Sequence, residues 1–78
     1  MYYTYVLKSI EDNKFYIGFT DNLKKRFREH QRGEVESTRT RRPFILIYYE
    51  ACLDKGQAIK REKYFKTGFG RRFLKSRI

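Results

Sequence analysis

The sequence has little of what secreted, membrane-bound and zinc-binding proteins need. It has one cysteine, Cys52, among 78 residues, so no internal disulfide can form. No apolar run approaches the roughly 18 residues of a membrane-spanning helix, and there is no signal-peptide pattern. Cysteine and histidine at zinc-binding spacing, a P-loop and a G-x-G-x-x-G pattern are also absent. We therefore expect a cytoplasmic protein with no membrane attachment.

Acidic residues are also few. Nine Asp and Glu face 19 Lys and Arg, which gives a formal net charge of +10. Such an excess attracts polyanions, and none of the cationic groups lies behind a strongly apolar, lipid-binding helix face. We therefore expect a nucleic-acid partner, although docking on an acidic protein would also explain the charge. The cations come in four groups: Lys24-Lys25-Arg26 with Arg28, Arg39 with Arg41-Arg42, Lys60-Arg61 with Lys63, and Arg71-Arg72.

The length of 78 residues predicts a single small domain, residues 1–78. Residues 2–8 and 14–19 are rich in aromatic and β-branched side chains, and a turn signal separates them, so they predict an antiparallel hairpin. Residues 44–49 are apolar without alternation. That pattern is typical of a strand covered on both faces, and we expect it in the middle of the sheet.

Three helices are predicted. The first covers about residues 22–32, with Asp21 or Thr20 as its N-cap and Gly33 just past its end. The second begins at the N-cap Asp54 and runs to Thr67, with Gly68 just past its end. The third covers residues 69–77. Residues 33–43 are expected to form a polar loop. The order is therefore β-β-α-β-α-α, an α+β fold.

Arg26 and His30 lie one helical turn apart on the first helix, so they occupy one face. Arginine offers bidentate hydrogen bonds to phosphate, and histidine can move a proton near neutral pH. Leu23 and Phe27 share the inward stripe with His30. A packed histidine with satisfied nitrogens is therefore the alternative interpretation, and for His30 alone it is the better one.

Tyr5 and Tyr16 belong to adjacent strands and can project from the same face. A phenol with a pKa near 10 is a poor base, but a cationic neighbour such as Arg26 would lower that pKa. Either tyrosine could then take a proton from water. The alternative is a pair of sheet aromatics whose polar tips face water.

Glu62 falls within the apolar arc that Ala58, Ile59 and Phe65 form on the second helix. A carboxylate in such a place is costly unless it is paired or binds a cation. Mg²⁺ often uses only one or two protein carboxylates. The residues alone support a metal ligand and a salt bridge to an arginine equally.

The ordered set of these residues resembles a GIY-YIG nuclease domain. The set consists of Tyr3-Thr4-Tyr5, Tyr16-Ile17-Gly18, Asn22 to Arg26 with His30, and Glu62. It is most similar to the short stand-alone bacterial members related to the nuclease module of the excision-repair incision subunit. The resemblance implies a three-stranded antiparallel sheet flanked by helices and metal-dependent hydrolysis of DNA. It also implies that Tyr5, Tyr16, Arg26 and His30 are catalytic and that Glu62 binds the metal.

We accordingly expect an endonuclease that uses Mg²⁺ or Mn²⁺ in DNA repair or processing. Arg26 would stabilise phosphoryl charge, His30 would assist proton transfer, and one tyrosine, for which we favour Tyr5, would act on the water. Selectivity for a DNA structure, or a partner protein, would supply specificity. A non-catalytic nucleic-acid-binding module of the same fold is the alternative. The residues expected to contact DNA are Lys24, Lys25, Arg39, Arg41 and Arg42.

Overall fold

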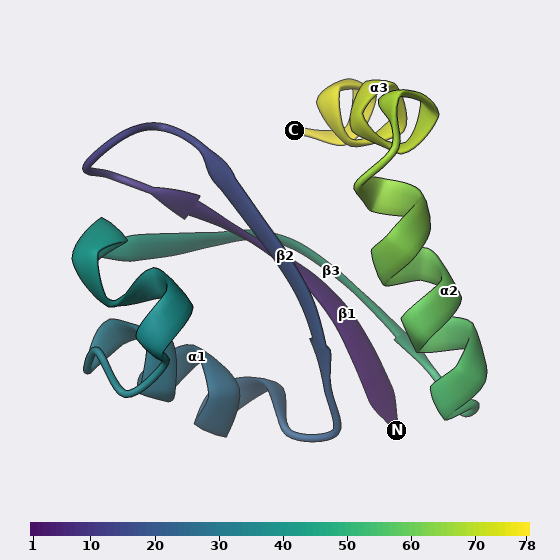
Figure 1. The fold of residues 1–78 in the computed structure, drawn as a ribbon. Coiled ribbons are helices and arrows are strands. Elements are labelled where there is room, and N and C mark those ends of the chain that lie inside the picture. The colour runs from purple at the N-terminus through teal and green to yellow at the C-terminus, as the bar shows by residue number, and fades with distance from the viewer.

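Strand β1 (Tyr2–Ser9) is the centre of the sheet in the computed structural model, which describes residues 1–78. It pairs antiparallel with β2 (Phe15–Thr20) on one side and with β3 (Phe44–Cys52) on the other (Figure 1). The prediction that residues 44–49 form the middle strand is therefore wrong. The unbroken apolar run was misleading because some of its side chains, Ile45 and Tyr49 among them, stay exposed at the sheet edge.

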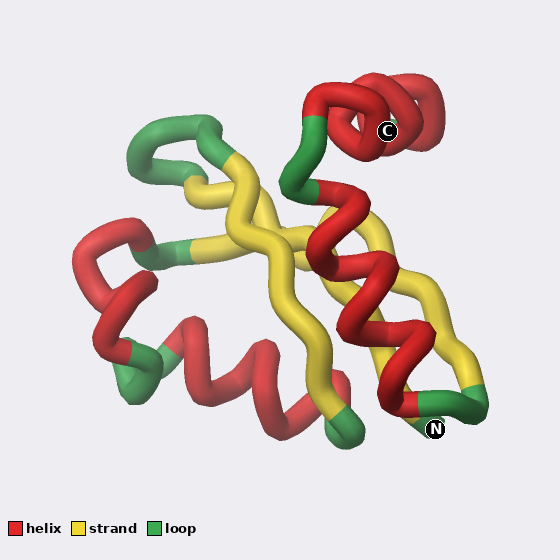
Figure 2. Tube along the Cα trace, turned by 45° about the vertical axis from the view of Figure 1, so that its right-hand side comes forward, coloured by secondary structure: helices red, strands yellow, loops and turns green.

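The helices cover both sides of this sheet. Helix α1 (Leu23–Gln31) lies on one side, and α2 (Lys55–Phe65) and α3 (Gly68–Arg77) lie on the other (Figures 1 and 2). The predicted α+β order β-β-α-β-α-α is confirmed. Part of the expected polar loop is instead a short 3-10 helix, η1 (Glu36–Arg41). No helix in this structure has both the length and the apolar character needed to cross a membrane.

The ends of α1 follow local side-chain chemistry. Its N-cap is Asn22 rather than Asp21 or Thr20, because the Asn22 side chain accepts a hydrogen bond from the Lys25 amide at 3.1 Å. Gly33 is confirmed just past the helix end. Its φ of 77° is the left-handed conformation that favours glycine, and its amide bonds to the His30 carbonyl at 3.2 Å.

The boundary between α2 and α3 differs from the prediction. Helix α2 ends at Phe65, before Thr67, and Gly68 is the first residue of α3. The Thr67 hydroxyl accepts a hydrogen bond from the Gly70 amide at 3.1 Å, so this threonine caps the new helix. A Cβ on Gly70 would lie 1.9 Å from the Tyr64 carbonyl oxygen. The tight turn therefore depends on glycine at position 70, which lets α3 pack closely against α2.

Two apolar clusters, one on each face of β1, form the core. On the face covered by α2 and α3, here called the α2 face, the buried members are Val6, Ile17, Phe65 and Leu74. On the face covered by α1, the α1 face, they are Tyr5, Leu7 and Phe44. Alternate residues of β1 thus supply opposite faces, as the period of a strand requires. The α1 face also buries the polar side chains of His30 and Thr38.

Candidate active site

Tyr5 is buried on the α1 face, and Gly18 makes room for it. The two residues are paired in the β1–β2 register. A Cβ on Gly18 would lie 2.6 Å from the Tyr5 hydroxyl oxygen, so any side chain at position 18 would displace the phenol. Glycine at this point of β2 therefore fixes the position of the Tyr5 hydroxyl.

A chain of buried hydrogen bonds starts at this hydroxyl. Tyr5 Oη lies 2.9 Å from His30 Nε2, and His30 Nδ1 lies 2.8 Å from Thr38 Oγ1. The Thr38 hydroxyl in turn donates to the Val35 carbonyl at 3.4 Å. Because Thr38 uses its proton there, it accepts from Nδ1–H, and Nε2 is left to accept from Tyr5. All three side chains are buried, and every hydrogen bond of the series is donated in the order Tyr5 to His30 to Thr38 to the Val35 carbonyl.

Thr38 is the residue that the sequence did not indicate. It lies in η1, a charged and polar segment, and nothing in its spacing marks it as buried. The packed-histidine interpretation of His30 agrees with its burial and with two satisfied nitrogens. The chain nevertheless connects His30 to Tyr5, so a structural role and a role in the site are compatible.

The protonation states of this chain differ from the expectation. Burial, with help from the nearby Arg26 charge, lowers the pKa of His30 to about 4, so the imidazole is neutral at pH 7. Burial also raises the pKa of Tyr5 to about 12, although hydrogen bonding to Arg26 acts in the opposite direction. Arg26 thus acts on the Tyr5 pKa in the expected direction, but burial outweighs it and the net pKa is raised.

Arg26 and Tyr16 lie next to this chain. The Arg26 guanidinium donates to the Glu29 carboxylate at 3.1 Å and lies close enough to the Tyr5 hydroxyl to act on its pKa. The Tyr16 ring centre lies 5.0 Å from that of His30 and 6.4 Å from that of Tyr5. The Tyr16 hydroxyl has no hydrogen-bond partner within the protein. The predicted placement of both tyrosines on one face is confirmed.

Glu62 approaches from α2, and its charge contributes to the raised pKa of Tyr5. Its side chain is 19% exposed, and its one ion-pair partner is the exposed Lys66 at 3.5 Å. The alternative of a salt bridge to an arginine is wrong, because the only cation in ion-pair contact with Glu62 is Lys66. The adjacent Arg61 is paired with Glu50 instead. A mostly buried carboxylate with so weak a partner retains the capacity to bind a cation.

The donor set suits a hard divalent ion. No group of three or more His, Cys, Asp or Glu side chains could hold a metal by itself. Mg²⁺, however, is commonly bound through one or two carboxylates, with water and substrate phosphate as the other ligands. Glu62 therefore fits an ion that binds together with its substrate.

The residues expected to contact DNA fall into two kinds. Lys24 and Lys25 are exposed on α1 and form no ion pair. Arg39 and Arg42 donate to the carbonyls of Gly33 and Arg39, respectively. Arg41 pairs with Asp12 at 3.2 Å and donates to the Phe15 carbonyl at 3.3 Å. The three arginines thus brace η1, whereas the two lysines are unengaged.

Comparison with known proteins agrees with this architecture. Residues 1–75 match the GIY-YIG catalytic domain. A UPF0213 protein of Staphylococcus haemolyticus is 39% identical over 67 residues, which are 85% of this chain and 80% of that protein. One of Lactiplantibacillus plantarum is 46% identical over 68 residues, or 83% of this chain and 66% of that protein.

A solved structure is similar as well. The solution NMR structure of a UPF0213 protein from Bacillus halodurans has a TM-score of 0.59 and 30% identity, and the match covers 97% of this chain and 84% of that one. These matches define a small nuclease-type domain. The chain belongs to the GIY-YIG family, and the relatives named here are bacterial UPF0213 proteins.

Proposed function

We propose that this protein is an endonuclease that hydrolyses DNA phosphodiester bonds with Mg²⁺ or Mn²⁺ bound at Glu62. The observation that carries the proposal is the Glu62 side chain, which is 19% exposed, has a single, exposed lysine partner and has a charge that acts on the pKa of Tyr5. When bound, the ion would supply Lewis-acid activation of the phosphate. The net charge of +10 favours DNA as the polyanion that completes the site.

Tyr16 is the better tyrosine for contact with the attacking water. The Tyr5 hydroxyl donates a hydrogen bond to His30, and its pKa of about 12 keeps the phenol protonated. The Tyr16 hydroxyl has no partner in the protein, so it is free to orient a water molecule. This assignment replaces the preference for Tyr5 that the sequence suggested.

Arg26 is the group that would stabilise charge on the phosphoryl oxygens. The direction of the hydrogen-bond chain supports this role. Because Tyr5 donates to His30, the Tyr5 oxygen is left as an acceptor for the Arg26 guanidinium. Thr38, His30 and Tyr5 would then act in series to hold Arg26 in place, with His30 neutral throughout.

The DNA would be held mainly by phosphate contacts, to which Lys24 and Lys25 are free to contribute. We propose that the activity serves DNA repair or processing and selects a DNA structure, or a partner protein, rather than a base sequence. The matched assay substrates are therefore branched, nicked and flapped DNA of one sequence.

Glu62→Gln tests the proposal, with Glu34→Gln as the control for loss of one carboxylate. Glu34 is exposed and pairs only with Arg32, at 3.9 Å. Without metal, Glu62→Gln should change the free energy of unfolding by less than about 0.5 kcal/mol, because its one ion-pair partner, Lys66, is exposed and 3.5 Å away. Cleavage and the rise of Tm with Mg²⁺ should both disappear, while DNA binding in chelator persists.

Glu34→Gln should retain cleavage and the Mg²⁺-dependent rise of Tm. Survival of cleavage in Glu62→Gln would overturn the metal assignment. A wild-type protein that binds all three substrates tightly and cleaves none with either ion would be the non-catalytic binding module.

A further inference from the structure

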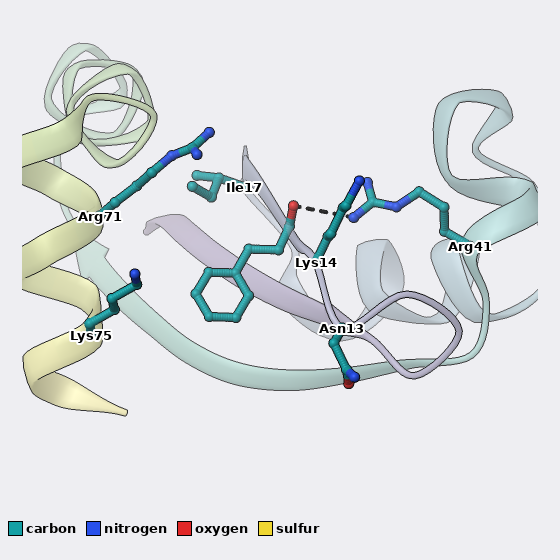
Figure 3. Close-up of a pocket in the computed structure, with 7 residues that line it drawn as sticks. Asn13, Lys14, Ile17, Arg41, Arg71 and Lys75 are labelled. Carbon is teal, nitrogen blue, oxygen red and sulfur yellow. Dashed lines mark hydrogen bonds between the residues drawn. The ribbon is translucent and has the colours of Figure 1, made fainter.

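A hollow of about 590 Å³ opens between α3 and the β1–β2 hairpin, away from Tyr16 and His30. Arg71 and Lys75 extend from α3 along one wall, and Lys14 and Arg41 form the opposite wall (Figure 3). The side chains of Phe15 and Ile17 lie between these walls and belong to the α2 face of the sheet. We call this hollow the hairpin pocket.

The hairpin pocket has an uncompensated positive charge. Four of its lining residues are Lys or Arg, and none is Asp or Glu. Only Arg41 has a carboxylate partner, Asp12 at 3.2 Å. Arg71 and Lys75 lie four residues apart on one helix, where like charges repel each other. An anion between the walls would relieve this repulsion.

The lining also has an aromatic side chain among its cations. Phe15 is only partly buried, and its carbonyl oxygen is fixed by the Arg41 guanidinium at 3.3 Å. Cations that track a phosphate backbone, together with an aromatic ring on which a base stacks, are the elements of single-strand recognition. A duplex hides the faces of its bases, so only an unpaired base could reach a ring inside a pocket.

We propose that the hairpin pocket binds a single-stranded nucleic-acid segment, with one base on Phe15 and its phosphates on the surrounding cations. The volume of about 590 Å³ lies within the range of pockets that enclose small organic ligands, which leaves room for a nucleotide. The proposal rests on the proposed function in that this strand is the unpaired part of the DNA substrate. Selection of flapped or branched DNA would follow from it.

The charge arm of the test uses Arg71→Gln with Lys75→Gln. The control is Arg72→Gln with Lys60→Gln, which also removes one arginine and one lysine from exposed helix positions outside the pocket. Fluorescence anisotropy measures the affinity for a single-stranded oligonucleotide in chelator over a range of salt. The pocket variant should bind more weakly than the control, and its log–log salt slope should become less steep by about 1.4, the value for two phosphate contacts. Equal losses in the two variants would overturn the proposal.

The stacking arm uses Phe15→Leu, and Phe69→Leu is its control because Phe69 is an exposed α3 aromatic outside the pocket. Leucine retains the apolar contacts of Phe15 with the core, and circular dichroism checks the fold. The oligonucleotide carries 2-aminopurine, whose fluorescence falls when it stacks on an aromatic ring. Phe15→Leu should lose this quenching and roughly fivefold or more in affinity, whereas Phe69→Leu should lose neither.

The two arms separate the possible sources of failure. A less steep salt slope in the charge variant, without any effect of Phe15→Leu, would mean that the pocket contacts phosphates only. The single-strand assignment would then be wrong. Both arms use chelator and need no cleavage. If wild type cleaves nothing and both arms still give the expected result, the proposed function fails while the pocket assignment holds.

Discussion

Arg26 on the α1 face and Arg61 on the α2 face are closely matched by exposure. Each arginine side chain is 36% exposed, and each is paired with a glutamate side chain that is 28% exposed. Their contacts differ. Arg61 makes two hydrogen bonds to Glu50, at 2.9 and 2.7 Å, and lies over the rings of Tyr64, Phe65 and Phe73.

Arg26 donates to Glu29 at 3.1 Å and lowers the pKa of the neighbouring Tyr5. A guanidinium has five N–H donors in a fixed arrangement. Arg61 uses two of them on one carboxylate, whereas Arg26 donates to Glu29 and lies beside the Tyr5 hydroxyl of the buried hydrogen-bond chain. Exposure and ion pairing alone therefore do not distinguish these two arginines, whereas their other neighbours do: three aromatic rings for Arg61 and the Tyr5 side chain for Arg26.

Alanine at these two positions gives the largest expected contrast. Arg26→Ala should slow DNA cleavage by about 10²–10³-fold, because a donor aimed at developing charge is lost. Affinity should fall much less, since one phosphate contact among several is removed. Single-turnover kinetics at saturating protein, alongside anisotropy in chelator, separate the two effects. Equal losses of rate and affinity would reduce Arg26 to a positioning contact.

Arg61→Ala is the matched control, and it should lower stability while leaving the cleavage rate unchanged. It removes a bidentate pair and three ring contacts, so the free energy of unfolding should fall by about 1–3 kcal/mol. The cleavage rate of the folded fraction should stay near that of wild type. Urea titration gives the first quantity, and cleavage below the unfolding transition gives the second. A rate loss as large as that of Arg26→Ala would remove the distinction between the two faces.

His30 extends the comparison to pH, because Arg26 lies near the buried imidazole as well as near Glu29, whereas Arg61 is paired with Glu50. Burial and the Arg26 charge keep the pKa of His30 at about 4 in the folded protein, against about 6.5 when unfolded. The unfolded state therefore binds the extra proton first as pH falls. Stability should be fully present above pH 6.5 and decline by about 3 kcal/mol as pH falls to 4.

His30 is the only histidine, so the part of this window above about pH 5 belongs to it alone, whereas carboxylates also take up protons at lower pH. Hydrogen bonding to Arg61 lowers the pKa of Glu50 despite its burial, so the pair on the α2 face should survive until more acidic conditions. Urea titrations between pH 7 and 4 measure the decline, and His30→Gln should flatten it. A wild-type stability that is constant over this range would contradict the buried neutral imidazole.

Local patterns predicted much of this architecture. The hairpin, the extent of α1 and the left-handed Gly33 follow from residues adjacent in the chain, and the spacing from Tyr5 to Glu62 identified the family. The middle strand was wrong because residues 44–49 show only that they are apolar. Which neighbours a strand has is decided by its pairing with β1, which lies 40 residues away in sequence.

Thr38 could not be predicted for the same reason. Its burial depends on how η1 folds back over His30, and the arginines around it indicate an exposed segment. The partner of Glu62 was also hidden, since it depends on Glu50 of β3 engaging Arg61. Interactions between distant segments thus determined the parts of the site that sequence patterns missed.

The smallest expected effect concerns two buried threonines, one on each face. Thr38 accepts from His30 Nδ1 at 2.8 Å, and Thr4 on the α2 face donates to the Ala58 carbonyl at 2.8 Å. Valine has nearly the same shape as threonine and lacks the hydroxyl. Thr4→Val should therefore cost about 1 kcal/mol of stability through one lost hydrogen bond, and Thr38→Val about 1–3 kcal/mol, because it also leaves the buried Nδ1–H of His30 unpaired.

Only Thr38→Val should also affect the site. Without its acceptor, Nδ1–H loses the bond that fixes the tautomer of His30, so Tyr5 and Arg26 are less well held. A loss of orientation worth about 1.4 kcal/mol would slow cleavage roughly tenfold. The ¹⁵N shifts of the single imidazole report its tautomer directly, and they should change in Thr38→Val but not in Thr4→Val. Thr38→Ser keeps the hydroxyl and should restore both the shifts and the rate. If both valine variants lose stability and neither changes the imidazole shifts or the rate, Thr38 is a structural residue like Thr4 and the chain does not position Arg26.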